Sequence, residues 1–189
     1  MLHEKFDVVL YVNRYNTQSI KKEYSIKKFE NDFSIHELEL EYVYGNLSQE
    51  RKEEIFKMWE DHTPLKKEAQ IKRVEQIVYI IKKDDHVVGV STAYLRKPPR
   101  REEKYYFFRT FIQPDIRGVI GAGFPDILRA TNQRMQEFND IEPLAGGMVV
   151  ITENPKLKRP GSRKLFRDGG WKYQGQTEKK QDIWFYSYA

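Results

Sequence analysis

The spacing of apolar and polar positions along the chain changes from segment to segment, and this change predicts both strands and helices. Over 36–44 apolar side chains alternate with mostly acidic ones, which is typical of a strand with one buried face and one acidic face. Residues 48–62 carry apolar positions at helical spacing behind Ser48, a suitable N-cap. Pro64 then interrupts the pattern, and a second, weaker helix is expected over 65–75.

Two apolar runs in the middle of the chain predict a β-hairpin. Residues 77–81 and 87–95 have the composition of its strands, and the polar residues 82–86 form the expected turn. Gly89 lies inside the second run, which indicates a bulge or a close approach of two backbones. The aromatic run 105–112 predicts another strand, because aromatic residues favour strands.

The remaining segments continue the alternation of helices and strands. An amphipathic helix is expected from Phe124 to about Phe138, with Pro125 in its first turn, where a missing N–H has no cost. The other expected elements are a strand over 7–12, a strand over 148–152, a short helix over 163–168, and two final strands over 171–173 and 183–188. The polar, lysine-rich residues between 13 and 32 fit no element securely.

A glycine-rich loop, Arg117-Gly-Val-Ile-Gly-Ala-Gly123, joins the strand 105–112 to the amphipathic helix. Glycines allow a sharp turn and a close approach to a ligand, and the first N–H groups of a helix favour phosphate. The same glycines also suit a tight connection without a ligand, and both interpretations stay open. The loop is not a P-loop, because no Lys-Ser or Lys-Thr follows the last glycine.

Composition narrows the classes of protein to consider. The 189 residues suffice for one domain, and 39% hydrophobic residues indicate a globular chain. Cysteine is absent, so disulfides and thiol catalysis are excluded, and the four histidines show no metal-ligand spacing, so we expect no metal site. No signal peptide or membrane-spanning run is evident, and we expect a cytoplasmic protein without a membrane partner.

The net charge of +5 is modest, and basic residues gather over 96–101 and 156–167. Such clusters suit nucleic acid, an acidic protein or a phosphorylated cofactor. Each cluster taken singly is better explained as a solvated surface, so a nucleic-acid partner is left open but not favoured.

The order of elements resembles the GNAT superfamily of N-acetyltransferases over roughly residues 33–189, with 1–32 as an N-terminal extension of unknown packing. The most specific segment is Ile112-Gln-Pro-Asp-Ile-Arg-Gly-Val-Ile-Gly-Ala-Gly123, similar to the loop that holds the pyrophosphate of acetyl-coenzyme A. A second match is Asn154, followed by residues 162–171. The resemblance implies an α/β (α+β) fold with a mixed, mostly antiparallel central sheet and helices on both faces.

The resemblance also implies an activity and a set of site residues. Acetyl-CoA is the expected co-substrate, and the expected partner is an amine-bearing acceptor, either a small molecule or a protein. Tyr106 and Glu103 lie where the family often places a base, although Glu103 is better explained as part of a charged loop and Tyr106 as a core or cleft-lining aromatic. The residues expected to bind the cofactor are Phe111, Ile112, Arg117, Gly118, Val119, Gly121, Ala122, Gly123 and Asn154.

Two departures from the family pattern keep a second function open. Counted from Arg117, the first motif glycine comes one residue late, so that Gly118 is the alternative start of the motif. Phe166 stands where many members have the tyrosine that protonates the leaving thiolate, and a phenyl ring has no proton to donate. The alternative is a non-catalytic module of the same fold that contacts protein or nucleic acid through its basic loops.

Overall fold

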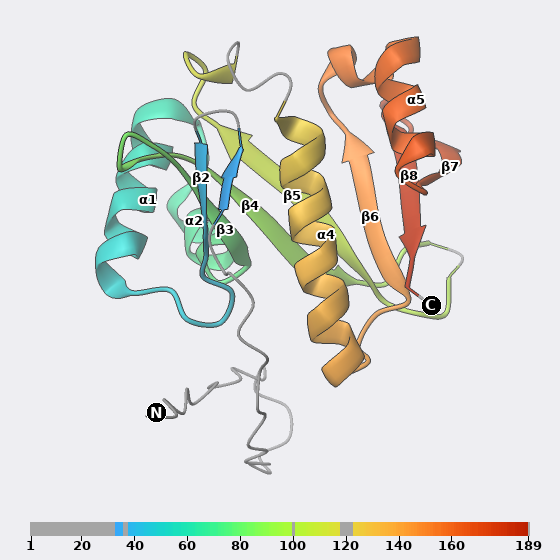
Figure 1. Cartoon of the computed structure of the whole chain (residues 1–189), viewed down its shortest axis with the longest axis horizontal. Helices are drawn as coiled ribbons and strands as arrows, with labels where there is room; N and C mark the ends of the chain where they lie inside the picture. The colour runs from blue at the N-terminus through green and yellow to red at the C-terminus, as the bar shows by residue number, and fades with distance from the viewer. Residues whose placement is uncertain (1–32, 36–37, 100, 118–122, 189) are drawn as a thin grey trace.

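The structure of the chain is a computed structural model that describes residues 33–35, 38–99, 101–117 and 123–188. Within these residues one eight-stranded sheet runs in the order β1-β2-β3-β4-β5-β6-β8-β7 (Figure 1). The strands are β1 Phe33–Ile35, β2 Leu38–Tyr42, β3 Ile77–Lys83, β4 His86–Arg96, β5 Tyr105–Ile112, β6 Gly147–Thr152, β7 Lys172–Gln176 and β8 Asp182–Ser187. The expected strand over 7–12 and the extension over 1–32 lie outside the described residues.

Helices cover both faces of the sheet. The helices of the described chain are α1 Gln49–His62, α2 Lys67–Val74, α4 Phe124–Ile141, α5 Pro160–Asp168 and the 3-10 helix η1 Pro155–Lys158. Ile127 and Met135 of α4 and Phe166 of α5 belong to the core cluster on one face. Ile55 and Trp59 of α1 belong to a second cluster on the opposite face. The predicted fold class is therefore confirmed.

The sheet is antiparallel except between β5 and β6, the one parallel pair among the described strands. A parallel pair needs a long crossover, and α4 with its flanking loops supplies it. This crossover brings the end of β5 and the end of β6 to the same edge of the sheet, where η1 and α5 also begin (Figure 1).

Local signals explain most of the element boundaries. The Ser48 hydroxyl accepts a hydrogen bond from the Arg51 N–H at 3.2 Å, so Ser48 caps α1 as expected. At the end of α5 the Trp171 N–H reaches the Phe166 carbonyl at 3.0 Å, while Gly170 takes a φ of +84° that favours glycine. Gly89 passes so close to β5 that an added Cβ would lie 2.5 Å from the Phe111 oxygen, which confirms the predicted close approach.

Several elements differ from the sequence expectation. The hairpin turn is shorter than the predicted 82–86, because Asp84 and Asp85 adopt positive φ angles of 50° and 62° and close a two-residue turn. The strand β1 was not expected. A 3-10 turn, η1, precedes α5, and α5 itself starts at Pro160 rather than near residue 163.

Candidate functional site

The two parallel strands separate after a short paired stretch. β5 and β6 pair only from Tyr106–Met148 to Phe108–Val150, although β5 continues to Ile112. Beyond this point β5 stays with β4, and β6 stays with β8. We call residues 109–112 and 151–154 the splayed region. Within the described residues, the edge of β5 that faces β6 has no strand partner there, so backbone groups remain for a ligand.

The turn after β5 uses part of its own backbone. The Arg117 N–H donates to the Gln113 carbonyl at 3.2 Å, and the Arg117 Nε donates to the Ile112 carbonyl at 2.8 Å. The Arg117 amide is therefore engaged within the turn and contributes no donor to an anion cradle. Gly123 forms the N-cap of α4, and its carbonyl accepts the N–H groups of Asp126 and Ile127.

The centre of the predicted phosphate loop is not among the described residues. Gly118, Val119, Gly121 and Ala122 all fall in the segment 118–122, outside the description. The loop as a phosphate cradle therefore stays a prediction from the sequence. The helix behind it does begin as expected, with Pro125 and Asp126 in the first turn of α4.

A pocket of about 350 Å³ opens on the face of the sheet that α1 and α2 cover. Its lining comes from the end of α1, the loop between the two helices, α2, and the end of β5: Trp59, His62, Thr63, Pro64, Leu65, Arg73, Phe111 and Arg117. Two side chains hold the loop in place. The Thr63 hydroxyl bonds the Trp59 carbonyl at 2.9 Å, and the buried Gln70 amide bonds the Leu65 carbonyl at 2.9 Å. The pocket wall is therefore built from fixed backbone.

Arginines gather where the pocket meets the splayed region. Burial lowers the pKa of Arg73, the positive charge of Arg109 lowers it further, and Glu153 and Tyr94 oppose that shift. Arg109 donates to the Tyr94 hydroxyl at 2.9 Å, with its guanidinium 4.5 Å from the centre of the Tyr94 ring. Arg117 lies 5.7 Å from the ring of Phe111. This end of β5 therefore favours an anionic ligand.

The two residues predicted as bases lie away from the splayed region. Glu103 is exposed and lies against Gly146, just before β5 begins. Because β5 has eight residues, Glu103 is about 25 Å from the far end of β5, where the splayed region lies. Tyr106 lies in the paired part of β5 and is fully buried, and its hydroxyl has no hydrogen-bond partner among the described residues. Burial raises the pKa of Tyr106, so the phenol stays protonated at neutral pH. The structure brings neither residue to the splayed region.

Asn154 and Phe166 lie at the other side of the splayed region. Asn154 lies two residues after the end of β6, and its side-chain oxygen caps η1 by accepting the Lys156 N–H at 2.9 Å. Its amide nitrogen is the group left to face a ligand. Phe166 is buried and stacks on Trp184 with ring centres 4.8 Å apart, so that it serves the core. Of the predicted binding residues, the structure thus brings Phe111, Ile112 and Asn154 to the splayed region.

Sequence reasoning missed Arg73, Tyr94, Arg109 and Glu153. They come from α2, β4, β5 and the end of β6, so no sequence motif links them. The available signal was weak: Arg109 is a charged residue inside an otherwise apolar run, and Glu153 directly precedes Asn154.

The described part of the chain holds no group of three or more His, Asp or Glu side chains placed to bind a metal ion. None of its helices combines the length and apolar character that a membrane crossing requires.

The chain is similar in structure to solved proteins, but its sequence matches no protein-family model and no curated protein. It is similar to a GNAT-family acetyltransferase from Streptococcus pneumoniae, with 11% identity and a TM-score of 0.48 over 79% of this chain and 96% of that chain. It is also similar to Arabidopsis thaliana NAA60 in complex with acetyl-CoA, with 11% identity and a TM-score of 0.47 over 79% of this chain and 98% of that chain.

Proposed function

We propose that the chain is an acyl-CoA-dependent N-acyltransferase that transfers an acetyl group from acetyl-CoA to a primary amine. The observation that carries the proposal is the separation of β5 from β6 after three residue pairs, next to a strand–glycine loop–helix segment. The unpaired edge of β5 matches the amide groups of a pantetheine arm, which needs backbone donors and acceptors in an extended arrangement. In this proposal residues 117–123 hold the diphosphate, mainly through the backbone N–H groups that follow Arg117.

The reaction needs a proton acceptor beside the amine. The amine nitrogen attacks the thioester carbon, the C–N bond forms, the C–S bond breaks, and one proton must leave the nitrogen. We assign this proton to the carboxylate of Glu153. Glu153 is exposed, directly follows β6 at the splayed region, and lies close enough to Arg73 to influence its pKa. Glu103 stays an alternative from the sequence, but its position at the opposite end of β5 does not favour it.

The leaving thiolate must receive a proton, and Phe166 has none to give. Tyr94 is the phenol that we assign to this role. Its hydroxyl accepts the Arg109 guanidinium at 2.9 Å and keeps its own proton available for donation. Arg109 begins the splayed region, so this hydroxyl lies at its closed end.

The lining of the pocket supports a proposal about the acceptor. Arg73 and Arg117 line it together with Trp59 and Phe111. Guanidinium groups bind carboxylates and phosphates, and the aromatic walls suit an apolar or aromatic body. We therefore expect an acceptor in which the amine is accompanied by a negatively charged group, rather than a polycation such as spermidine.

Two measurements test the proposal. Acetyl-CoA at about a hundredfold excess over Kd is expected to raise the melting temperature by about 5–10 °C. Gly121→Asp places a carboxylate in the predicted phosphate loop and should abolish the shift. Asn46→Asp is the control for the added charge, because it places the same carboxylate at an exposed position in the turn after β2.

A thiol-release assay with amines that do and do not carry a carboxylate or phosphate then tests turnover. Acetyl-CoA binding without thiol release for any amine would favour the non-catalytic module. Absence of any thermal shift would contradict the acyltransferase proposal itself.

A further inference from the structure

The net positive charge of the chain is concentrated in one short segment. Residues 153–180 hold nine Lys or Arg and three Asp or Glu, a net charge of +6, whereas the whole chain carries +5. All other residues together therefore sum to −1. We call these nine basic side chains the basic corner: Lys156, Lys158, Arg159, Arg163, Lys164, Arg167, Lys172, Lys179 and Lys180.

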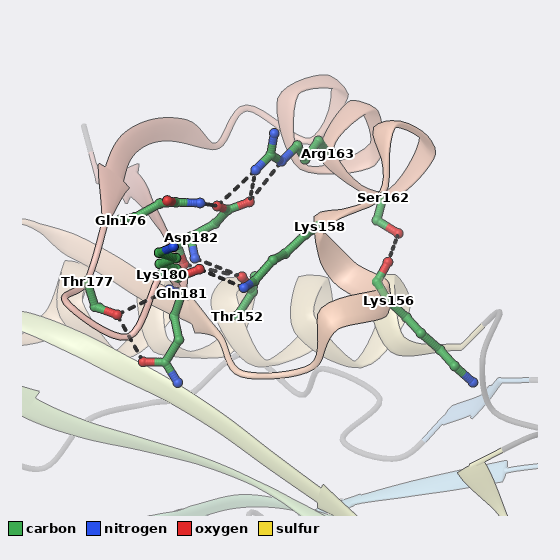
Figure 2. Close-up of polar contacts among 10 residues, drawn as sticks. All are labelled: Thr152, Lys156, Lys158, Ser162, Arg163, Gln176, Thr177, Lys180, Gln181 and Asp182. Carbon is green, nitrogen blue, oxygen red and sulfur yellow. Dashed lines mark hydrogen bonds and ion pairs between the residues drawn. The ribbon is translucent and has the colours of Figure 1, made fainter.

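The fold joins two basic segments that are separate in the sequence. Lys158 in η1 donates to the carbonyl of Lys180 in the β7–β8 turn at 2.6 Å (Figure 2). Arg163 in α5 donates to the two Asp182 carboxylate oxygens at 2.8 and 3.0 Å, which ties α5 to β8. The residues of η1, α5 and the β7–β8 turn therefore lie side by side at one end of the sheet.

A buried carboxylate fixes this arrangement. Asp182 is 0% exposed, and besides Arg163 it accepts the Gln176 amide at 2.8 Å (Figure 2). Its own backbone N–H meets the Thr152 hydroxyl at 3.2 Å. Because β6, β7, β8 and α5 all contribute a partner, the basic corner keeps its shape before any ligand arrives.

The charges of the basic corner are largely uncompensated. Among the described residues, carboxylates pair with only two of the nine: Asp182 with Arg163, and Asp168 with Lys164. An exposed aromatic side chain accompanies the charges. Tyr173 is 48% exposed, and the Arg163 guanidinium lies 5.8 Å from its ring centre. The Arg163 charge is itself paired with Asp182, so the cations left for a ligand are the seven unpaired ones. Unpaired cations and an exposed ring on the same corner are what a single-stranded nucleic acid contacts with its phosphates and bases.

We propose that the basic corner binds single-stranded nucleic acid through its phosphate backbone, with Tyr173 stacking on a base. An acidic protein is the weaker alternative. Six of the nine side chains are lysines, which are depleted at protein–protein interfaces but neutralise phosphates at little cost, because the released counterions supply the driving force. RNA and DNA share the phosphodiester chemistry recognised here, so the experiment must compare them. The proposal is independent of the acyltransferase activity.

The test is fluorescence anisotropy with labelled single strands of RNA and DNA, about 20 nucleotides long and of equal sequence. With about five phosphates neutralised, affinity should fall about 100-fold between about 50 and 200 mM salt. The triple variant Arg159→Gln, Lys172→Gln, Lys179→Gln should bind at least about tenfold more weakly and lose about two units of the log–log salt slope. Tyr173→Ala should weaken binding by at least about fivefold without changing the slope, while Tyr173→Phe should bind normally.

The matched control is Lys57→Gln, Lys66→Gln, Lys72→Gln, which removes the same charge from exposed positions on or beside α1 and α2. It should change affinity by less than about twofold. Equal weakening by both triple variants would show that net charge alone attracts the strand, and would overturn the proposal. Absence of binding, tighter binding to poly-glutamate than to RNA and DNA, or displacement by acetyl-CoA would overturn it too. The last result would assign the corner to the acyl donor.

Discussion

Two polar clusters lie near the end of β6, and they are built in opposite ways. Around Asp182, a fully buried carboxylate meets Arg163 through both oxygens and also accepts Gln176. Around Arg73, cations accumulate instead: Arg109 lies close enough to lower the Arg73 pKa, and burial lowers that pKa more strongly. Glu153 is the carboxylate that opposes these two effects.

The difference separates a structural cluster from a functional one. A buried charge whose hydrogen-bonding capacity is filled holds elements together and offers nothing to a ligand. Like charges held close together, with one exposed carboxylate beside them, cost folding free energy and leave binding capacity for an incoming anion. We therefore expect substitutions in the two clusters to change stability in opposite directions.

The largest effect is expected at Asp182. Asp182→Ala removes the shared acceptor of Arg163 and Gln176, and it should lower the free energy of unfolding by about 3–5 kcal/mol. Asp182→Asn keeps the side-chain shape and one acceptor oxygen, so it should lower the free energy of unfolding clearly less. Urea denaturation followed by tryptophan fluorescence measures both variants. A loss below about 1 kcal/mol for Asp182→Ala would mean that the cluster does not hold α5 and β7 in place.

The next effect concerns turnover. Glu153→Gln removes the proposed proton acceptor and should reduce kcat/KM in the thiol-release assay about 100-fold, with acetyl-CoA binding unchanged. Glu103→Gln is the control and should have little effect, because Glu103 lies at the other end of β5. If Glu103→Gln reduced turnover and Glu153→Gln did not, our assignment of the base would be reversed.

Tyr94→Phe follows, because it removes one hydroxyl and leaves the ring under the Arg109 guanidinium. We expect kcat to fall at least about tenfold while KM for the acceptor stays constant. A rise in KM at constant kcat would instead show that the hydroxyl only helps to position the substrate. Steady-state kinetics at saturating acetyl-CoA distinguishes the two outcomes.

Arg73→Met should move stability and activity in opposite directions. Methionine fills similar volume without a desolvated charge next to Arg109, and a gain of about 0.5 kcal/mol is expected, small because the guanidinium stays partly exposed and screened. Turnover with anionic amines should fall. Arg167→Met, at an exposed position in α5, should change neither quantity. A stability loss for Arg73→Met would show that Glu153 outweighs the repulsion.

The smallest effect is expected at Tyr106, whose buried hydroxyl lacks a partner among the described residues. Tyr106→Phe should be neutral or stabilise by up to about 1 kcal/mol. Burial raises the pKa of Tyr106 above its usual 10.0, so the folded chain resists deprotonation and its stability falls as pH rises above about 10. Tyr106→Phe should reduce this alkaline loss, measured by urea midpoints at pH about 8 and about 11. If Tyr106→Phe loses as much stability at alkaline pH as the unmodified protein, other tyrosines cause that loss.

Much of the fold was predictable because its signals are local. The N-cap Ser48 and the apolar run of β5 each act on neighbouring residues, and both predictions are confirmed. The hairpin turn was predicted too long, because Asp84 and Asp85 entered the left-handed region that the polar stretch did not reveal. β1 was missed because its three residues pair only across a short connection with β2.

The candidate site was less predictable, since its members meet only through tertiary contacts. A strand run such as 105–112 shows that β5 exists, but the residue at which it leaves β6 depends on how β8 and β4 hold the two strands apart. Tyr106 and Glu103, the bases predicted from family positions, lie outside the splayed region because β5 leaves β6 only after Phe108. The phosphate loop is a local pattern, and its central residues 118–122 stay a prediction.

By itself the sequence determined the order of helices and strands and the excess of positive charge near its end, because periodicity and charge are properties of neighbouring residues. Only the tertiary structure decided which charges meet a partner. Arg163 is neutralised by Asp182 from a strand nineteen residues later, whereas Arg73 and Arg109, on separate elements, come together without a buried carboxylate partner in the described part of the chain. Electrostatic energy depends on distance and burial, and neither quantity exists before the chain has folded.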